Sequence, residues 1–480
     1  MDSLQAPAPR DQALAALSSF RTEFYACLTR RADALFELTD ALLCADGPVS
    51  SLPELSLEPV HRRGHGALYD ALACGRIHLA RLQLTLTGLD LPHLADGQLA
   101  IAIDITPWPR PDAECSPDRV HCHRPCRCDG KRKTIPGWPY SIAAALGPGR
   151  TCWTAPLEVR GIGAAEDVTE ATAGQIRDLI ERLVEAGQWA PGDPPVLIVC
   201  DAGYDIVRLS WLLGDLPVRL LGRIRSDRVM YTPAPPARRD GKPGRRPRHG
   251  SEFTFADPST WPAADTETIS AHDRFGKVSA CLGMRLHPKL ERRLAWADHT
   301  GVLPIVEGAV IYVSVERLPG GRRPQPLWLW FSDPQAAGVD LDGLWRAYLR
   351  RFDLEYTFRM WKQVLGLTRP RVRSPAQADR WFWLIVVAYT QLGLARHLVE
   401  DLRRLWEGSL SVDRLTPGRV RRGFRRIHRA LGTPAGAPKP GRPGPGRPRG
   451  RVSRPAPRYP VGKKYRKADM PRRGGKKQPG

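Results

Sequence analysis

Residues 341–365 read LDGLWRAYLRRFDLEYTFRMWKQVL, and this stretch decides which fold the chain is expected to adopt. Four of its side chains carry groups suited to chemistry: Tyr348, Arg351, Glu355 and Lys362. In a helix, which turns about 100° per residue, these four fall within a stripe about 60° wide. The stripe combines an aromatic hydroxyl, two cations and one carboxylate, and its neighbours are apolar enough to pack. This pattern is typical of a catalytic face that binds metal and phosphate, although a solvated charged stripe has the same spacing.

The chain has 480 residues, of which 42% are hydrophobic, so it can form two to four domains with a sizeable core. Its formal net charge is +23. Such a charge favours a polyanionic partner, because Lys and Arg that neutralise phosphates release condensed counterions. Nucleic acid is therefore the expected partner. A GC-rich genome would also enrich Arg, but it would not place the charge so unevenly.

The C-terminal residues 434–480 hold fifteen Lys or Arg and a single acid, Asp469. The segment is too rich in Pro and Gly to build a core, which predicts a disordered basic tail. Residues 446–451 read GRPRGR, which resembles an AT-hook, a short arm that lies in a narrow minor groove. Three arginines are candidate DNA contacts on this basis: Arg447, Arg449 and Arg451. A basic tail without any groove preference is the alternative.

The N-terminal residues MDSLQAPAPRDQALAALSSF lack a basic segment followed by a long apolar core, so no secretory leader is expected. The ten Cys are then expected to be free thiols in a cytoplasmic protein. The strongest apolar run, residues 381–389, meets Thr390 and Gln391 before it could span a bilayer. It is therefore expected to form a buried helix.

Apolar runs and helical periodicity predict an α/β core. The expected strands are residues 99–104, 140–146, 153–159, 195–201 and 218–224, and the expected helices are residues 167–187 and 205–214. Three strands, a helix, a strand, a helix and a strand predict a mixed sheet with crossover connections. This order matches a ribonuclease H-like core.

Changes in composition divide the chain into six segments. They are an N-terminal helical domain that could bind DNA ends (1–95), the first part of the core (96–228), a β-rich insertion (229–333), a catalytic helix that completes the core (334–370), C-terminal helices (371–433) and the basic tail (434–480).

Two aspartates support a catalytic interpretation of the helix. Asp104 and Asp201 each follow an apolar run, at the ends of strands where ligands of open α/β sheets bind. Each alone is also common turn chemistry. Two divalent cations are bound by several carboxylates that point toward one place. Asp104 and Asp201 would supply two of these carboxylates, and Glu355 could supply the third from the helix.

The four helix residues match Tyr-x2-Arg-x3-Glu-x6-Lys, which resembles the signature of a large branch of bacterial insertion-sequence transposases of the DDE type. Asp104 lies in Ile-Asp-Ile-Thr and Asp201 in Asp-Ala-Gly-Tyr, similar to the first two acids of that family. The sequence between Asp201 and Glu355 is too long for a bare ribonuclease H-like fold, and in this branch a β-rich insertion explains the excess. The resemblance covers residues 99–367.

This resemblance implies metal-dependent cleavage and strand transfer at the ends of an insertion sequence. It implies that Asp104, Asp201 and Glu355 hold two Mg²⁺ ions, for which Mn²⁺ can substitute. It further implies that DNA phosphates bind to three other residues: Tyr348, Arg351 and Lys362.

The same resemblance implies partners and a location. The expected partners are double-stranded terminal inverted repeats and target DNA, bound by a homodimer associated with the bacterial nucleoid. Trp328 and Trp330 are candidates for stacking on a displaced base if a terminal hairpin forms, whereas an alternating aromatic strand in the core is the alternative.

Other interpretations stay open. The chain could be an inactive, domesticated DNA-binding derivative of a transposase, or a nuclease of the same fold that cuts without joining. Residues 121–128, HCHRPCRC, contain ligand types for zinc in the long loop expected after the first strand, but a second ligand pair at finger-like spacing is missing from the sequence. Asp205 and Asp353 are spare acids, and Asp353 is expected to point away from Glu355.

Overall fold

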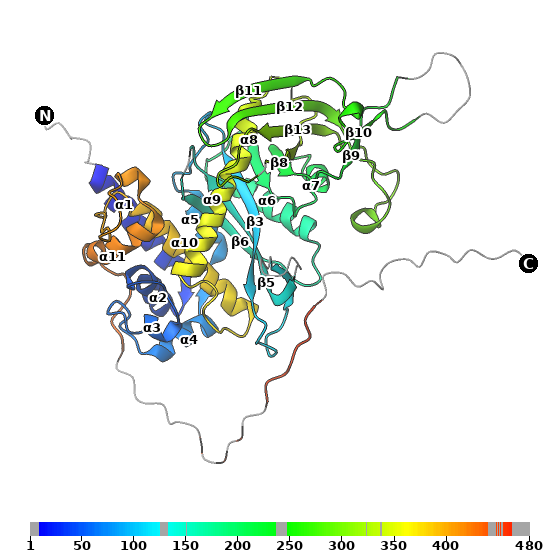
Figure 1. The fold of residues 1–480 in the computed structure, drawn as a ribbon. Helices are drawn as coiled ribbons and strands as arrows, with labels where there is room; N and C mark the ends of the chain where they lie inside the picture. Colours follow the sequence, from blue (N-terminus) through cyan, green and yellow to red (C-terminus); the bar gives the residue numbers. More distant parts are fainter. Residues whose placement is uncertain are drawn as a thin grey trace, which may run out of the picture.

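The computed structural model describes residues 9–124, 133–149, 151–236, 247–322, 324–336, 338–439, 448, 450, 452 and 455–462. One large mixed sheet dominates it, and a mostly helical region lies beside the sheet (Figure 1). The predicted mixed α/β class is confirmed, and the arrangement is compatible with a ribonuclease H-like core.

Helices and two short strands make up the N-terminal region. They are α1 (Pro9–Cys27), β1 (Leu28–Arg30), α2 (Ala32–Cys44), α3 (Leu52–Leu55), α4 (His65–Cys74), β2 (Arg76–Ile77) and α5 (Leu79–Thr87). Nearly every residue of α2 is buried, because α4 and two helices from the C-terminal region pack around it. The helices before and after the sheet therefore form one cluster, a long-range contact that the sequence does not reveal.

The C-terminal helices of this cluster are α10 (Pro375–Leu394) and α11 (Pro417–Leu431), with the short η4 (Val412–Arg414) between them. The start of α10 follows from its sequence: Ser374 caps the helix, Gln377 completes a capping box and Pro375 occupies the first turn. The apolar run 381–389 is buried within α10, as predicted. In the described part of the chain, the helices are all too short or too polar to cross a membrane.

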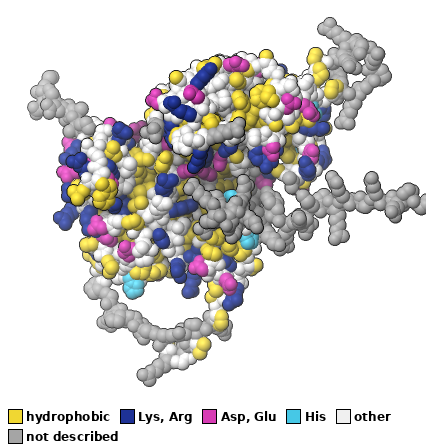
Figure 2. All heavy atoms as spheres, in the orientation of Figure 1, with side chains coloured by type: hydrophobic (Ala, Val, Ile, Leu, Met, Phe, Trp, Pro, Cys, Tyr) yellow, Lys and Arg dark blue, Asp and Glu magenta, His cyan; other side chains and the backbone are white. Residues whose placement is uncertain are grey.

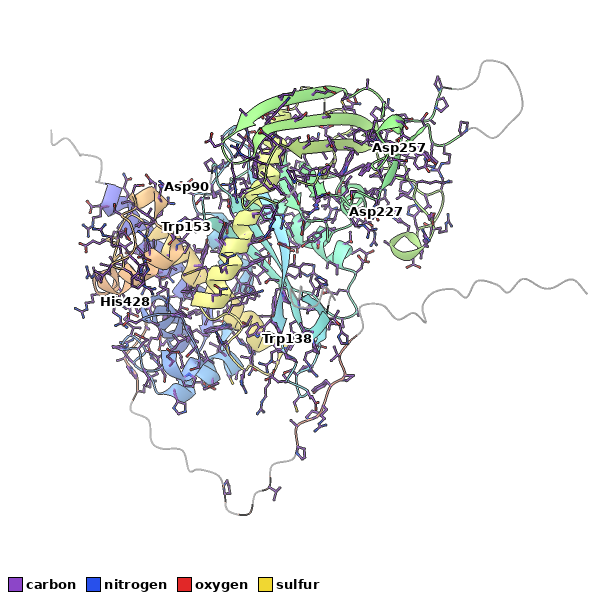
Figure 3. All side chains as sticks on the ribbon, viewed as in Figure 1. Asp90, Trp138, Trp153, Asp227, Asp257 and His428 are labelled. Atoms are coloured by element: carbon purple, nitrogen blue, oxygen red, sulfur yellow. The ribbon has the colours of Figure 1, made fainter. Side chains whose placement is uncertain are left out.

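Trp153 joins the helical cluster to the sheet. Its indole Nε1 donates a hydrogen bond to the backbone oxygen of Leu415 at 2.7 Å, and its ring lies 5.5 Å from that of Tyr389 on α10. Figure 3 shows Trp153 between the two parts of the molecule.

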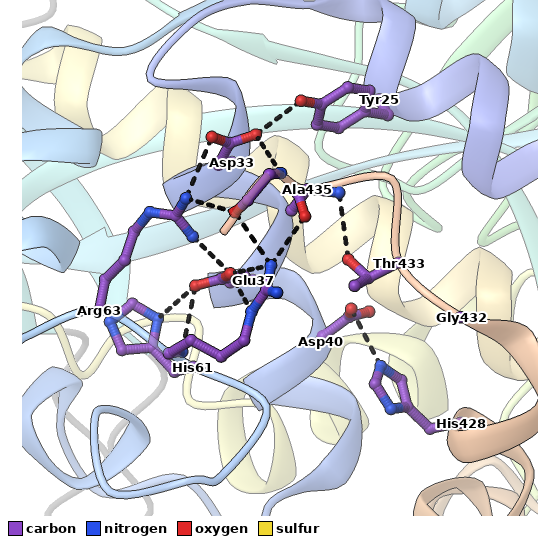
Figure 4. A network of polar contacts seen from close by, with 12 residues as sticks. Tyr25, Asp33, Glu37, Asp40, His61, Arg63, His428, Gly432, Thr433 and Ala435 are labelled. Atoms are coloured by element: carbon purple, nitrogen blue, oxygen red, sulfur yellow. Dashed lines mark hydrogen bonds and ion pairs between the residues drawn. The ribbon is translucent and has the colours of Figure 1, made fainter. Parts of the chain in front are cut away.

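A network of buried charges holds the helical cluster together, and Figure 4 shows the part of it around Glu37 and the pair of Asp40 with His428. Arg21 of α1 contacts both carboxylate oxygens of Asp40 on α2, at 2.6 and 3.0 Å. His428 of α11 lies 3.0 Å from the same carboxylate, and Gln391 of α10 accepts a hydrogen bond from Arg21 at 2.8 Å. One carboxylate and one guanidinium thus connect four helices.

The central sheet has the strand order β11-β12-β13-β14-β8-β7-β3-β5-β4, with β6 paired to β5. Its core elements are β3 (Ala100–Pro109), β4 (Val120–Arg124), β5 (Lys133–Leu146), β6 (Thr154–Gly161), α6 (Val168–Glu185), β7 (Val196–Cys200), α7 (Ile206–Leu212) and β8 (Val218–Arg223). β3 and β8 both pair in parallel with β7, whereas β5 is antiparallel to β3.

The first hairpin is longer than the sequence predicts. A long loop was expected after the first strand, but β3 continues to Pro109 and pairs with β5, and β4 adds an edge strand. Trp108 and Trp138 stand opposite each other in this pairing, with ring centroids 6.1 Å apart in an edge-to-face arrangement. This aromatic pair stabilises the ladder although prolines interrupt it.

In the described part of the region expected to be a β-rich insertion there are six strands and two short helical turns: β9 (Val229–Tyr231), β10 (Glu252–Thr254), η1 (Pro258–Thr260), β11 (Thr266–His272), β12 (Gly276–Leu286), η2 (Leu294–Trp296), β13 (Gly308–Val315) and β14 (Leu327–Phe331). β9 and β10 pair with each other, and Tyr231 of β9 also forms an isolated antiparallel bridge with His287. The other four strands continue the central sheet, because β14 pairs antiparallel with β8 (Figure 1).

Parts of the C-terminal tail contact the folded chain, although the sequence predicts disorder throughout it. Arg62 and Arg63 both donate hydrogen bonds to the backbone oxygen of Gly436. Residues 455–462 lie against the segment between β3 and β4, where the buried Arg119 donates to the backbone oxygen of Tyr459 at 3.0 Å. The candidate DNA contacts Arg447, Arg449 and Arg451 lie outside the described residues.

Candidate active site

Two neighbouring parallel strands place Asp104 and Asp201 side by side. The register pairs Ala102 with Val199 and Ile103 with Cys200, so Asp104 and Asp201 stand at the next position of the ladder. Asp104 is still within β3, and Asp201 comes directly after β7. The prediction that the two aspartates lie on adjacent strands thus agrees with the strand pairing, but only Asp201 stands at a strand end, because β3 continues past Asp104 to Pro109.

Side-chain alternation explains which face of the sheet the two aspartates occupy. Ile101 and Ile103 pack against α6 and α7, whereas Ala100 and Ala102 belong to the core on the opposite face. Since side chains of a strand alternate between faces, Asp104 shares the face of Ala100 and Ala102. Trp345, Tyr348 and Leu354, from the predicted catalytic helix, also belong to the core on that face.

The predicted catalytic helix consists of three consecutive pieces: α8 (Leu341–Arg350), α9 (Phe352–Arg359) and η3 (Met360–Val364). Arg351 joins the first two and keeps helical torsion angles, φ −52° and ψ −32°. η3 is a π-helical turn, a wider form that often occurs at functional sites, and it contains Lys362. The segment ends at Gly366, whose φ of +70° is easily adopted only by glycine.

Three carboxylates surround the guanidinium of Arg351. One of its terminal nitrogens, Nη1, lies 3.2 Å from Oδ2 of Asp104. The other, Nη2, lies 3.5 Å from Oδ1 of Asp201 and 3.9 Å from Oε1 of Glu355. The structure therefore brings together the three predicted acids around one cation.

The exposure of these side chains shows where the site opens to solvent. Arg351 is 4% exposed and Asp104 20%, whereas Asp201 is 38% and Glu355 53% exposed. Asp104 thus forms the inner wall, and the side of Glu355 faces solvent. Exposed aromatic rings of Phe352 and Tyr356 lie on the same helix as Glu355.

Burial controls the charge of the innermost acid. Removal from water raises the pKa of Asp104 to about 6, although Arg351 and the backbone N–H of Ile105 favour its charged form. Burial alone would lower the pKa of Arg351, but the carboxylates of Asp201, Asp104 and Glu355 raise it above its ordinary value. The guanidinium therefore stays charged among the three acids.

Tyr348 and Lys362 also face the acids. The hydroxyl of Tyr348 donates to Oδ1 of Asp201 at 3.4 Å, and burial raises its pKa to about 12. Burial lowers the pKa of Lys362 to about 8, while the charge of Asp104 opposes this shift. The four residues of the predicted stripe therefore converge on these two acids, although Tyr348 and Arg351 are buried rather than free for an incoming ligand.

The donor atoms suit a divalent cation in kind, because carboxylate oxygens are the ligands that Mg²⁺ and Mn²⁺ prefer. Their present spacing suits a guanidinium instead. Within the described ranges, His, Cys, Asp and Glu form no group of three that could hold a metal ion as the side chains stand. A metal at this site would therefore require Arg351 to move from between Asp104, Asp201 and Glu355.

The assignment of Trp328 and Trp330 as base-stacking residues is not supported. Trp328 is 3% and Trp330 0% exposed. The ring of Trp328 stacks on that of Phe255 at 4.0 Å, and Nε1 of Trp330 donates to Ser210 at 3.0 Å. Both are core residues, because this face of β14 packs against other parts of the insertion and α7.

The spare acids have structural partners. Asp205 caps α7 by accepting a hydrogen bond from the backbone of Arg208 at 3.1 Å, and the buried Asp353 lies 3.3 Å from Arg350. Within residues 121–128, His121 and Cys122 lie on β4, and Cys126 and Cys128 are outside the described residues.

Sequence reasoning missed the inward direction of Arg351, which was expected to bind DNA phosphates. Arg351 stands four residues before Glu355, a spacing that allows an ion pair along a helix, and this signal could have indicated the contact. The contact with Asp104 and Asp201 is long-range and appears only in the folded chain.

Comparison with known proteins places the chain in a family. The family model described as DDE superfamily endonuclease matches residues 23–280, which is more than half of the chain. The matched part contains Asp104 and Asp201 and ends before Glu355. A search of proteins with curated descriptions found no match.

Proposed function

Because the chain belongs to the DDE superfamily of endonucleases, we propose that it is a DNA transposase of the branch with the Tyr-x2-Arg-x3-Glu-x6-Lys signature. In this proposal it cleaves the ends of an insertion sequence and joins them to target DNA in a reaction that depends on Mg²⁺ or Mn²⁺. The substrate is double-stranded DNA that carries terminal inverted repeats, and the working form is a homodimer on that DNA.

One observation carries the proposal: acids from β3, from the end of β7 and from α9 surround a single cation within 3.9 Å. Such an arrangement of three carboxylates around positive charge is what phosphoryl transfer on DNA requires, because charge develops on the attacking and leaving oxygens.

Each side chain then has a part in the reaction. Asp104, Asp201 and Glu355 would hold the divalent cations, which when bound would neutralise charge on the attacking and leaving oxygens. Asp104 fixes its orientation by accepting a hydrogen bond from the backbone N–H of Ile105 at 2.8 Å. Lys362 stands near Asp104 and would hold a DNA phosphate beside the cut, and the open side by Glu355 admits the strand.

The net charge of +23 supports a DNA substrate, although the described face has no separate basic patch. Figure 2 shows Lys and Arg side chains spread over the described face, mixed with acidic and hydrophobic ones. The tail adds a concentrated basic segment at the C-terminal end. Sequence-independent attraction to phosphates would bring the duplex to the site before cleavage begins.

A supercoiled plasmid that carries the ends of the element tests the proposal, with Mg²⁺ or Mn²⁺ present. The expected result is cleavage at the ends followed by their appearance in a second, target plasmid. Cleavage without joining would show that the protein is a nuclease and not a transposase. Binding without cleavage would show that it is an inactive DNA-binding derivative. Either result contradicts the proposal. A plasmid without the ends serves as the control substrate.

Removal of residues 440–480 should weaken DNA binding without abolishing cleavage. This cut keeps residues 435 and 436, which accept hydrogen bonds from Arg62 and Arg63. The slope of log affinity against log salt should become shallower by about 0.9 for each phosphate that the shortened chain no longer neutralises. A chain that lacks only residues 463–480 keeps the docked segment 455–462 and should show an intermediate slope. An unchanged slope in both would show that the tail does not bind DNA.

A further inference from the structure

Arg351 occupies a position that a bound metal ion would need. Its guanidinium lies between Asp104, Asp201 and Glu355, and its side chain is 4% exposed. In the described part of the chain, the acids are not placed to hold a metal by themselves. The folded chain thus places a cation of its own at the centre of these acids.

The three contacts differ in strength. Only the distance to Asp104, 3.2 Å, is that of a hydrogen bond. The distances to Asp201 and Glu355, 3.5 and 3.9 Å, correspond to charge attraction without direct bonds. Among the described residues, the remaining nitrogen, Nε, has no hydrogen-bond partner. The guanidinium is therefore held by charge and by the rings of Tyr348 and Phe352, 5.7 and 4.7 Å away, more than by a complete set of hydrogen bonds.

We propose that Arg351 keeps divalent metal out of the acid cluster until DNA is bound. When a DNA phosphate arrives at the open side, the guanidinium turns from the carboxylates to the phosphate, and the vacated position accepts the metal. The inference rests on the proposed function, and it adds a coupling between substrate binding and metal binding.

Physical reasons favour such an exchange. A guanidinium and a divalent cation in one buried space repel each other strongly, so both cannot occupy the centre. A phosphate offers oxygens that match the planar fork of Arg and form charge-assisted hydrogen bonds. Exposure rises from Asp104 to Glu355, which gives the phosphate an approach from the side of Glu355. DNA and metal should then bind with positive coupling.

Mn²⁺ binding to the full chain, measured by calorimetry and by the electron paramagnetic resonance signal of free Mn²⁺, tests this inference without reference to cleavage. In the absence of DNA, Arg351→Gln should bind Mn²⁺ at least about tenfold more tightly than the wild type, since three acids lose their resident cation. A duplex containing the element's end should tighten Mn²⁺ binding to the wild type about tenfold or more and change that of Arg351→Gln little.

Arg346→Gln is the matched control. Arg346 lies on α8, is 50% exposed and pairs with Asp342, so its loss removes the same charge without touching the acids. It should leave the Mn²⁺ affinity unchanged. Equal or weaker Mn²⁺ binding by a folded Arg351→Gln would overturn the inference, because a purely structural arginine predicts that result.

The wild type alone gives a second measurement in case Arg351→Gln does not fold. Equal Mn²⁺ affinity with and without DNA would overturn the inference even if the protein cleaves DNA normally. Conversely, coupled binding of DNA and Mn²⁺ by a protein that cleaves no DNA would support the inference and contradict the proposed function. The two failures are therefore distinguishable.

Discussion

Asp104→Asn, Asp201→Asn and Glu355→Gln will each reduce DNA cleavage by a factor on the order of 10³ or more, as expected when one member of a catalytic set that acts as a unit is removed. The amides keep the size of each side chain but remove the charge that would hold a metal ion. Asp104→Asn also keeps an oxygen that can accept the hydrogen bond from Ile105. Cleavage of labelled element ends in Mg²⁺ measures the effect, and gel-shift titration should show that DNA binding survives.

Asp227→Asn provides the control for these substitutions. Asp227, labelled in Figure 3, is 65% exposed, forms an ion pair with the exposed Arg225, and lies in the loop between β8 and β9. The Asp227→Asn variant should cleave DNA at the same rate as the wild type. Wild-type cleavage by any one of the three acid variants would remove that residue from the catalytic set.

The second large effect is expected on stability. Asp40→Ala should lower the free energy of unfolding by about 3–5 kcal/mol, because it leaves the buried charge of Arg21 without its carboxylate. Asp40 is 2% and Arg21 3% exposed, so solvent does not screen the pair. Urea denaturation at neutral pH measures the loss. Glu23→Ala, which breaks the half-exposed pair of Glu23 with Arg81, should lower the free energy of unfolding far less, because solvent screens that pair.

The same carboxylate predicts how stability depends on pH. Burial alone would raise the pKa of Asp40, but its hydrogen bond with His428 and the charge of Arg21 lower it below the ordinary value. In the unfolded chain the carboxyl group of Asp40 has a pKa of about 3.9. The contribution of Asp40 to the free energy of unfolding is therefore fully present above about pH 3.9. It disappears as the pH falls through the lower pKa that Asp40 has in the folded chain. The difference between wild type and Asp40→Ala should shrink in acid, and a difference that grew there would contradict this account.

Local patterns in the sequence predict the strands β7 and β8 well, and they predict that Asp104 and Asp201 follow apolar runs on neighbouring strands. Alternating or continuous apolar runs depend on neighbours in the chain, so residues 195–201 and 218–224 predict β7 and β8 with small errors at the ends. The helix signature likewise predicts which residues face the acids. These features need no knowledge of distant contacts.

Long-range contacts explain what the sequence could not predict. The burial of Trp328 depends on Phe255 and Trp261, which approach it only after the insertion folds. The alternation of aromatic side chains in β14 fits both an exposed platform and a core strand, and only the packed structure distinguishes them. The docking of residues 455–462 beside Arg119 depends on a contact across most of the chain.

The continuation of the core sheet into β14 has a consequence for how the chain avoids aggregation. Without β14, the buried apolar strand β8 would end the sheet with unpaired backbone groups, an edge that invites pairing with another chain. The added strands move the edge outward to β11, where Thr, Ser, Glu and His predominate and Ile269 is the exposed large hydrophobic residue. Removal of residues 229–333 would therefore expose the unpaired edge of β8 beside the proposed catalytic acids, and a fragment shortened in this way should be insoluble.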